Sequence, residues 1–373
     1  MYEQDQRIVM TLDAGGTNFV FSAMQGGCEI LAPIRLHAVA DDLKGCLDVL
    51  VDGFTQVRRA VVGDPAAISF AFPGPADYRN GIIGDLPNFP AFRGGVALGP
   101  YLSRQFGLPV FINNDGNLYA YGEALSGMLP EINRMLEASG SPRRYANLIG
   151  ITLGTGFGAG VVVDGRLLTG DNGCGGDVWL MRNAKYPELM AEESVSIRAV
   201  RRVYAERSGE DASALSPRDI FDIAEGVRPG DREAAVRSFE ELGEVAGDAI
   251  VRALDIVDGL VVFGGGISGA ARYIMPGMIR EMRRSVGTFS GASFPCLQAE
   301  VYDLSDPGGL RAFLEEKDRM VKIPGSDEEV HYACHKKTGV AHSRLGASRA
   351  IALGAYAYAL SQLDGGADAA VKA

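Results

Sequence analysis

The chain has 373 residues, a length at which one hydrophobic core usually gives way to two domains. Apolar residues make up 47% and charged residues 22%, which is ordinary for a globular protein, and no apolar run is long enough to predict a membrane span. A formal net charge of −11 without a clustered basic run argues against a nucleic-acid-binding surface.

The N-terminus and the cysteines bear on cellular location. The opening residues, MYEQDQRIVM, contain acids and lead directly into a strand-like run, which is not typical of a secretory signal. The five cysteines are scattered and form no CxxC pair, which is typical of reduced thiols. We therefore expect a cytoplasmic protein with neither a membrane nor a nucleic-acid partner.

The first part of the chain reads as an α/β unit. A helical stretch from about 42 to 62 is flanked by short apolar runs, and a second helical pattern follows Asp115. The predicted strands are 7–12, 19–24, 66–72 and a run near 110. We place the first domain at 1–116.

The second part repeats the plan of an apolar run, a glycine turn and another apolar run. It begins with ANLIGITLGTGFGAGVVVDG, continues with helical patterns over much of 190–257, and includes the strand-like GLVVFGGG. We expect a second, larger domain at 117–343. A helix of small residues at about 344–363 is expected to pack back on the first domain.

The stretch LDAGGTNFVF admits two interpretations. Gly15 and Gly16 could simply turn a β-hairpin, which needs no ligand. Alternatively, a glycine turn lets phosphate oxygens approach main-chain N–H groups, with hydrogen bonds from Thr17 and Asn18 and with Asp13 near a metal, directly or through water. Taken alone, the hairpin is the simpler interpretation.

Two further glycine turns follow apolar runs, one at Gly154, Thr155 and Gly156 and one at Gly264, Gly265 and Gly266. Ligands of open α/β sheets bind beyond the strand ends, so three such turns from two domains could converge on one cleft. No P-loop sequence is present, and GGGISG is a poor dinucleotide fingerprint.

Seven motifs in order give the chain a specific resemblance. DAGGTN, FPGP, LPNF, PVFINNDGN, GTGFGAGVVVDG, VFGGGIS and LGASRAIALGA span nearly the whole sequence, which resembles the ROK family of sugar kinases. The resemblance implies a two-lobed, actin-like (ribonuclease-H-like) α/β ATPase fold with an interdomain cleft. It also implies transfer of the γ-phosphate of ATP, with magnesium, to a hexose hydroxyl.

The resemblance assigns roles by position. Asp13, Gly15, Gly16 and Thr17 are similar to the family's first phosphate loop, with Asp13 near magnesium. Gly154 to Gly156 resemble the second phosphate loop, and Gly264 to Gly266 the turn beside the adenosine. The sugar-contacting positions match Asn88, Asn114 and Asp115, together with Asp177 and Glu192.

Asp115 resembles the catalytic base, since a sugar hydroxyl is a weak nucleophile whose proton must leave as the phosphoryl group arrives. From the residues alone, NND is better explained as a turn that caps the following helix. The family resemblance reverses that preference.

The sequence departs from the family pattern after Gly176. Asp177 stands at the position of a Glu, Leu180 at that of a His, and the cysteines of a zinc loop are missing, so we predict no family-type zinc site. Glu192 aligns with a sugar-binding Glu, although the adjacent Glu193 leaves the register open.

Three of the four histidines gather with a cysteine in a late segment that looks like an insertion, at about 303–343. His331, Cys334, His335 and His342 are a weaker candidate for a metal site, because their spacing fits no standard finger. The segment itself could be a lid, a dimer contact or an inert excursion.

The leading expectation is a cytoplasmic, homodimeric ATP:hexose kinase that converts glucose to glucose 6-phosphate. An N-acetylhexosamine kinase (for N-acetylmannosamine or N-acetylglucosamine) or a fructose kinase is the close alternative. A non-catalytic sugar sensor or a ROK-type regulator is the alternative of another class. The phosphate-loop strand begins near residue 7, which leaves no space before it for DNA-binding helices.

Overall fold

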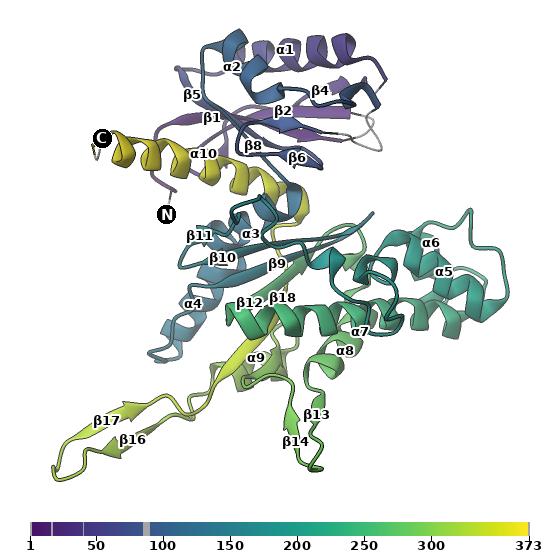
Figure 1. Cartoon of the computed structure of the whole chain (residues 1–373), viewed down its shortest axis with the longest axis vertical. Coiled ribbons are helices and arrows are strands. Elements are labelled where there is room, and N and C mark those ends of the chain that lie inside the picture. The colour runs from purple at the N-terminus through teal and green to yellow at the C-terminus, as the bar shows by residue number, and fades with distance from the viewer. Residues whose placement is uncertain (1, 16–17, 40, 85–89, 372–373) are drawn as a thin grey trace. The chain divides into compact units, whose positions relative to one another are not determined.

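A computed structural model describes residues 2–15, 18–39, 41–84 and 90–371 (Figure 1). The chain forms two compact units that are each assembled from separate segments. The first unit comprises Met1–Gly127, Gly160–Gly176 and Leu345–Ala373, and the second comprises Met128–Ala159 and Asp177–Arg344. Within the described residues, no helix combines the length and the apolar character needed to span a membrane.

The first unit is built on a sheet with the strand order β3-β2-β1-β5-β8, in which β4 also pairs with β2. Strand β1 is antiparallel to β2 and parallel to β5, which is parallel to β8. The strands are β1 (Ile8–Ala14), β2 (Asn18–Gln25), β3 (Cys28–Glu29), β4 (Ile34–His37), β5 (Pro65–Ala71) and β8 (Val110–Asn113). A small hairpin of β6 (Ala76–Asp77) and β7 (Ile82–Ile83) follows β5.

Helices cover both faces of this sheet. Successive side chains of a strand point to opposite faces, and β1 follows this rule: Met10 packs in a cluster with Phe54 of α1, whereas Val9 packs with Leu353 and Tyr356 of α10. Burial on both faces explains why IVMTL is almost continuously apolar. The helices of this unit are α1 (Leu43–Ala60), α2 (Leu98–Phe106), α3 (Asp115–Ser126) and α10 (Ala347–Val371), with a short 3₁₀ turn η1 (Pro90–Phe92).

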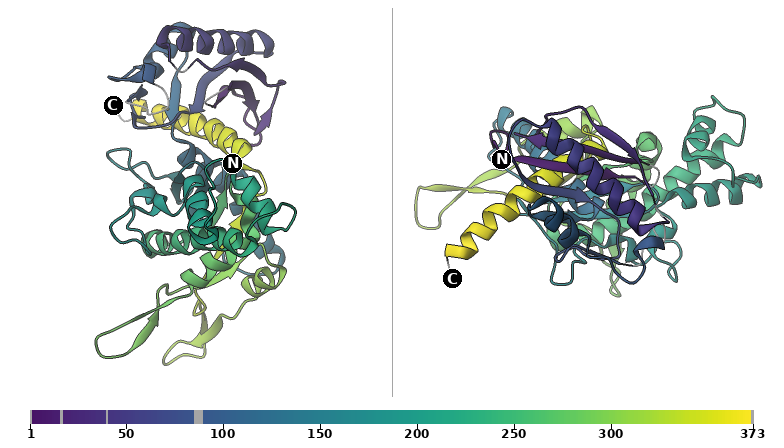
Figure 2. Two further views of the ribbon diagram at one scale, coloured as in Figure 1. Left: turned by 90° about the vertical axis from the view of Figure 1, so that its right-hand side faces the viewer. Right: turned by 90° about the horizontal axis from the view of Figure 1, so that it is seen from above.

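The C-terminal helix α10 therefore belongs to the first unit, where it packs on α3, β5 and β1 (Figure 2). The two helices meet at glycines. A Cβ on Gly354 would lie 1.8 Å from the carbonyl oxygen of Leu118, and a Cβ on Gly122 would lie 1.9 Å from that of Ala350. Backbone touches backbone at this crossing, so neither position has space for a side chain.

The second unit contains parallel strands in the order β9-β12-β18-β15. They are β9 (Leu148–Leu153), β12 (Leu260–Gly264), β18 (Lys337–His342) and β15 (Glu300–Asp303). Strand β10 (Phe157–Val163) has residues in both units, and it pairs with β11 (Arg166–Leu167). The expected insertion at 303–343 is therefore wrong in its extent, because β18 is an interior strand of this sheet.

The helices of the second unit surround these strands, and the largest apolar cluster joins β9 and β12 to α7 and α8. The helices are α4 (Met128–Ala138), α5 (Ile197–Ser208), α6 (Pro217–Ala224), α7 (Arg232–Val257), α8 (Ala271–Met282) and α9 (Pro307–Leu314), with 3₁₀ turns η2 (Val178–Leu180), η3 (Ala191–Glu193) and η4 (Ser268–Ala270). Two hairpins extend from this unit (Figure 1). They are β13 (Ser285–Gly287) with β14 (Ser293–Pro295), and β16 (Arg319–Lys322) with β17 (Glu329–Tyr332).

Candidate functional site

In the first unit, the predicted site residues lie at one edge of the sheet. The register pairs Asp13 of β1 with Ala71 of β5, and Ala71 with Asn113 of β8. These three residues stand at the carboxyl ends of parallel strands, which is the edge where open α/β sheets bind ligands. Asp13 is therefore two strands away from the segment that carries Asn114 and Asp115, a separation of about 10 Å between the strands.

The first glycine turn joins β1 to β2. The Gly15 amide donates to the carbonyl oxygen of Asn18, 3.1 Å away, which closes the hairpin, and Asn18 is the first residue of β2. The local structure is thus the hairpin expected from the sequence, and a hairpin turn of this kind is also compatible with a phosphate loop. Gly16, Thr17 and Asn88 lie outside the described residues.

The start of α3 shows which residue caps this helix, Asn114 or Asp115. Asn114 is the N-cap, and its Oδ1 accepts a hydrogen bond of 2.6 Å from the amide of Asn117. Asp115 is the first helical residue, and its Oδ1 accepts from the amide of Gly116 at 2.9 Å. The NND turn therefore caps the helix, as the residues alone suggested, but the capping oxygen comes from Asn114 and not from Asp115.

Asn113 and Asn117 hold this helix start in place. The Nδ2 of Asn117 donates to the Oδ1 of Asn113 at 2.9 Å, and both side chains are buried. The same Oδ1 accepts from the Asn114 amide at 2.9 Å. Sequence reasoning missed both positioning residues; the repeated amides in INNDGN are the signal that could have identified them.

Asp115 combines exposure to water with a perturbed acidity. Its side chain is exposed, yet it is closely surrounded by protein atoms, and this desolvation raises the pKa of its carboxyl group above the ordinary aspartate value. The hydrogen bond from the Gly116 amide opposes the shift. A carboxylate that is accessible and more basic than usual is suited to accept a proton from a bound hydroxyl group.

In the second unit, the other two glycine turns adjoin each other. Gly264 ends β12 opposite Thr152 of β9. The next residue, Gly265, has φ +100°, and a Cβ there would lie 2.4 Å from the carbonyl oxygen of Leu153. Only glycine permits this backbone contact. The Gly264–Gly266 turn therefore rests on the residue that precedes Gly154, and two of the three predicted loops lie side by side.

The turn at Gly154–Gly156 offers an accessible backbone. A Cβ on Gly154 would meet no atom, so the space beside this residue is open, and Thr155 is exposed. The carbonyl oxygen of Gly154 accepts from the amide of Ile197 at 2.9 Å, which ties the turn to the start of α5. The turn thus has both a fixed position and an open side, which is the requirement for a phosphate loop.

Glu192 contacts this same turn, although it is far away in the sequence. Its Oε2 accepts from the amide of Phe157 at 3.0 Å, and a Cβ on Gly156 would lie 2.4 Å from that oxygen. Its Oε1 is 2.9 Å from the guanidinium of Arg198, which also pairs with Glu193 at 2.7 Å. Of the two glutamates, it is therefore Glu192 that joins a predicted sugar-binding position to a predicted phosphate loop. Arg198 was not anticipated.

Asp177 and Leu180 flank the short turn η2. Asp177 precedes this turn without capping it through its side chain, and Leu180 is 58% exposed. At the position where the family pattern has a histidine, this chain thus presents an apolar side chain to solvent.

The rings of the late histidines each have a different partner. The Nε2 of His335 lies 2.9 Å from Glu300, that of His331 lies 3.5 Å from Asp318, and the His342 ring stacks on Phe263. Burial lowers the pKa of His342. Across the part of the chain that the structure describes, no three His, Cys, Asp or Glu side chains are grouped so as to hold a metal ion.

Comparisons with known proteins agree on one family. The model of the ROK family matches residues 9–310. The crystal structure of a glucokinase from Parabacteroides distasonis is 60% identical, covers 97% of this chain and 99% of its own, and superposes with a TM-score of 0.88. Glucokinase from Thermotoga maritima is 29% identical over 77% of this chain and 92% of its own. N-acetyl-D-glucosamine kinase from Vibrio cholerae is 28% identical over 82% and 98%.

Proposed function

The chain belongs to the ROK family, and from this premise we propose that it is an ATP-dependent hexose kinase whose preferred substrate is glucose. The observation that carries the proposal is Asp115, an accessible carboxylate of raised pKa that is not needed as a helix cap. The 60% identity to a glucokinase favours glucose among the hexoses.

The proposed reaction assigns a task to each group. Asp115 takes the proton of the sugar hydroxyl while that oxygen forms a bond to the γ-phosphorus and the bond from the γ-phosphorus to the bridging oxygen of ADP breaks. The turns at Gly15–Asn18 and Gly154–Gly156 hold the phosphates through main-chain amides. Gly264–Gly266 lies beside the adenosine. Bound ATP supplies the phosphoryl group.

Asn114 and Glu192 are proposed to bind the sugar, together with Asn88 and Asp177. The Oδ1 of Asn114 already caps α3, so its amide group is the part that would donate to a sugar hydroxyl. Glu192 is fixed by Arg198 and the Phe157 amide, which orients the carboxylate before the sugar arrives. Such fixed polar groups reduce the ordering cost of binding.

Magnesium is proposed to arrive with the nucleotide. Mg²⁺ commonly uses one or two carboxylates together with substrate phosphates rather than a cage of protein ligands. Asp13, at the end of β1 and next to the first phosphate loop, suits this role. A homodimer in the cytoplasm is proposed as well, and the five free cysteines support a reducing compartment.

The test is a panel of glucose, N-acetylglucosamine, N-acetylmannosamine and fructose with ATP and Mg²⁺, read out as ADP release, with and without a chelator. We expect the highest kcat/KM for glucose and no turnover with the chelator. The similarity to N-acetyl-D-glucosamine kinase makes that sugar the second candidate. Sugar binding without ADP release from any member of the panel would instead identify a sensor.

A pH profile tests the raised pKa of Asp115. The base must be ionised to accept a proton, so kcat/KM is expected to fall as the pH drops through this pKa. Because the shift is upward, the acid limb should lie above the range of an ordinary aspartate, whose pKa is about 3.9. The measurement is kcat/KM for glucose against pH from neutrality downward, which reports the pKa of the free enzyme, with far-UV circular dichroism to verify folding. Undiminished kcat/KM at pH 4 in a folded protein would contradict the assignment.

Paired variants test the choice between the two adjacent glutamates. Glu192→Gln keeps an oxygen that can accept from the Phe157 amide but loses the charge proposed to bind a sugar hydroxyl. KM for glucose is therefore expected to rise by about 10-fold or more, the usual size of a lost charge-assisted hydrogen bond. Glu193→Gln is the matched control and should change KM less than about twofold. Its carboxylate, which pairs with Arg198, is more exposed than that of Glu192. A larger effect at Glu193 would reverse the register.

A further inference from the structure

The β16–β17 hairpin (Arg319–Lys322 and Glu329–Tyr332) forms a separate two-stranded sheet and pairs with no other strand of the described residues. It is anchored at its base, where Asp318 accepts from the His335 amide at 2.9 Å and pairs with Arg143 at 3.2 Å. Isolated two-stranded hairpins are marginally stable in water. This one nevertheless carries exposed apolar side chains on both strands.

The register of the hairpin sorts its side chains onto two faces. Directly paired residues share a face, and faces alternate along each strand. Arg319 pairs with Tyr332 and Val321 with Val330. The same register continues to Ile323 and Glu328, whose backbone hydrogen bond is 2.9 Å long. These six residues constitute the hairpin face; the opposite face carries Met320, Lys322, Glu329 and His331.

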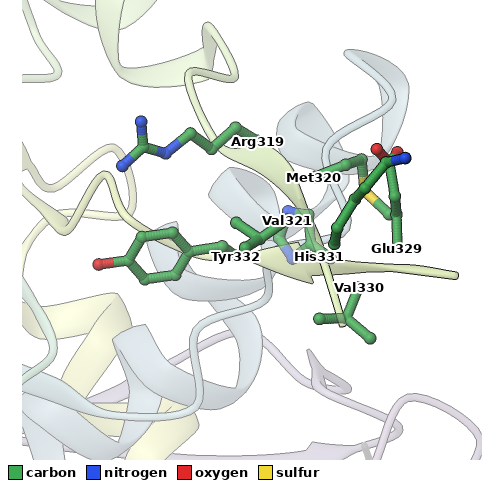
Figure 3. Close-up of a pocket in the computed structure, with 8 residues that line it drawn as sticks. Arg319, Met320, Val321, Glu329, Val330, His331 and Tyr332 are labelled. Carbon is green, nitrogen blue, oxygen red and sulfur yellow. The ribbon is translucent and has the colours of Figure 1, made fainter. Parts of the chain in front are cut away.

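The hairpin face is apolar in its middle and charged at its ends. Its four apolar side chains, Val321, Ile323, Val330 and Tyr332, are 37–50% exposed. At one end, the guanidinium of Arg319 lies 5.5 Å from the centre of the Tyr332 ring, and Figure 3 shows these two side chains extending to the same side. At the other end stands Glu328.

We propose that the hairpin face binds the hairpin face of a second copy of this chain, with the strands of the two hairpins running in reversed directions. A two-fold axis that lies between the faces, perpendicular to the strands at the level of Val321 and Val330, places Arg319 of one copy over Ile323 of the other, one strand away from Glu328. Both charged ends then meet opposite charges around an apolar centre, as an isologous interface requires. The proposal gives a surface to the homodimer proposed above and rests on it.

Pairing through the edges of two β16 strands fits the charges less well in one register. Two β16 strands joined antiparallel about Met320 and Val321 would bring Arg319 opposite Lys322 of the other copy. Directly opposed like charges destabilise a strand pair. Packing of face on face avoids this repulsion and buries the exposed valines.

The contact is expected to be modest in strength. Four partly exposed apolar side chains from each copy cover less surface than the roughly 1,200 Å² at the lower end of stable interfaces. We therefore expect a dimer that dissociates on dilution, with a Kd in the micromolar range, rather than a permanent one.

Sedimentation velocity of the full chain, over about 1 to 100 μM around that Kd, provides the test. Val321→Asp places a charge at the centre of the face and is expected to weaken dimerisation by at least about 10-fold. Met320→Asp is the matched control, since it alters the neighbouring residue of the same strand on the opposite face. It should retain the wild-type mass distribution. Equal loss of dimer in both variants would mean that hairpin stability alone is responsible, and would overturn the proposal.

A charge exchange tests the geometry independently. Arg319→Glu and Glu328→Arg should each weaken dimerisation, because each places like charges at both ends of the interface, and the double variant should recover it. The proposal fails if the double variant is no better than the single ones, or if the wild-type chain is monomeric throughout. It also fails if Val321→Asp remains fully dimeric, although a homodimer through another surface would then stand. Sugar-dependent ADP release by the wild-type chain tests the kinase assignment separately.

Discussion

Asp115→Asn is expected to reduce turnover by about 10²-fold or more while glucose still binds, because the amide keeps the size of the side chain but cannot take the proton of the sugar hydroxyl. The general-base contribution to catalysis is of this magnitude. The measurement is kcat and KM for glucose from ADP release, together with the glucose Kd by calorimetry. A loss confined to kcat would assign Asp115 to the transition state.

Asn114→Ala is the control that separates this effect from helix capping. Asn114 Oδ1 caps α3, so its removal should cost about 1 kcal/mol of unfolding free energy, whereas Asp115→Asn should leave stability nearly unchanged. Thermal unfolding of both variants makes the comparison. Near-normal turnover in a folded Asp115→Asn variant would remove this residue from the mechanism and leave the kinase proposal dependent on the glycine turns.

Gly354→Ala is expected to give the largest loss of stability. Its added methyl group would lie 1.8 Å from the carbonyl oxygen of Leu118, and the contact is with backbone, so the helices α3 and α10 must move apart. Overpacking of this kind typically costs about 1–3 kcal/mol and outweighs the gain of up to about 1 kcal/mol in helix propensity. The measurement is the midpoint of urea unfolding, followed by the fluorescence of the protein.

Gly365→Ala is the matched control within the same helix. A Cβ at Gly365 would meet no atom, so only the propensity gain remains, and this variant should be as stable as the wild type or slightly more stable. The opposite order of the two variants would show that α3 and α10 are further apart than the structure has them.

Several features of the fold could be predicted because they depend on local sequence. The glycine turns follow apolar runs, and the helix expected at 42–62 is α1, whose start is fixed by Asp42 as N-cap. The expected membership of the ROK family is confirmed. This prediction depended on the order of the motifs, because each glycine turn alone is as typical of a tight connection as of a phosphate loop.

Other features depend on contacts that are distant in the sequence. Strand β18, KTGVAH, has only a short apolar run and lies in the segment that looks like an insertion; it becomes a strand because it lies between β12 and β15. Likewise, Asn114 and Asp115 are both good N-caps, and only the backbone at the helix start decides between them. The contact of Glu192 with the Phe157 amide spans 35 residues, so no local pattern could reveal it.

The position of α10 has a consequence for how this protein is made on the ribosome. Val9, Met24 and Ala67 are among the first core residues to be synthesised, yet the helix that covers them, with Leu353 and Tyr356, is among the last. At about 5–20 residues per second, tens of seconds pass between the two. During that interval, one apolar face of the nascent sheet has no cover, and a chaperone that shields such surfaces should raise the yield of folded enzyme.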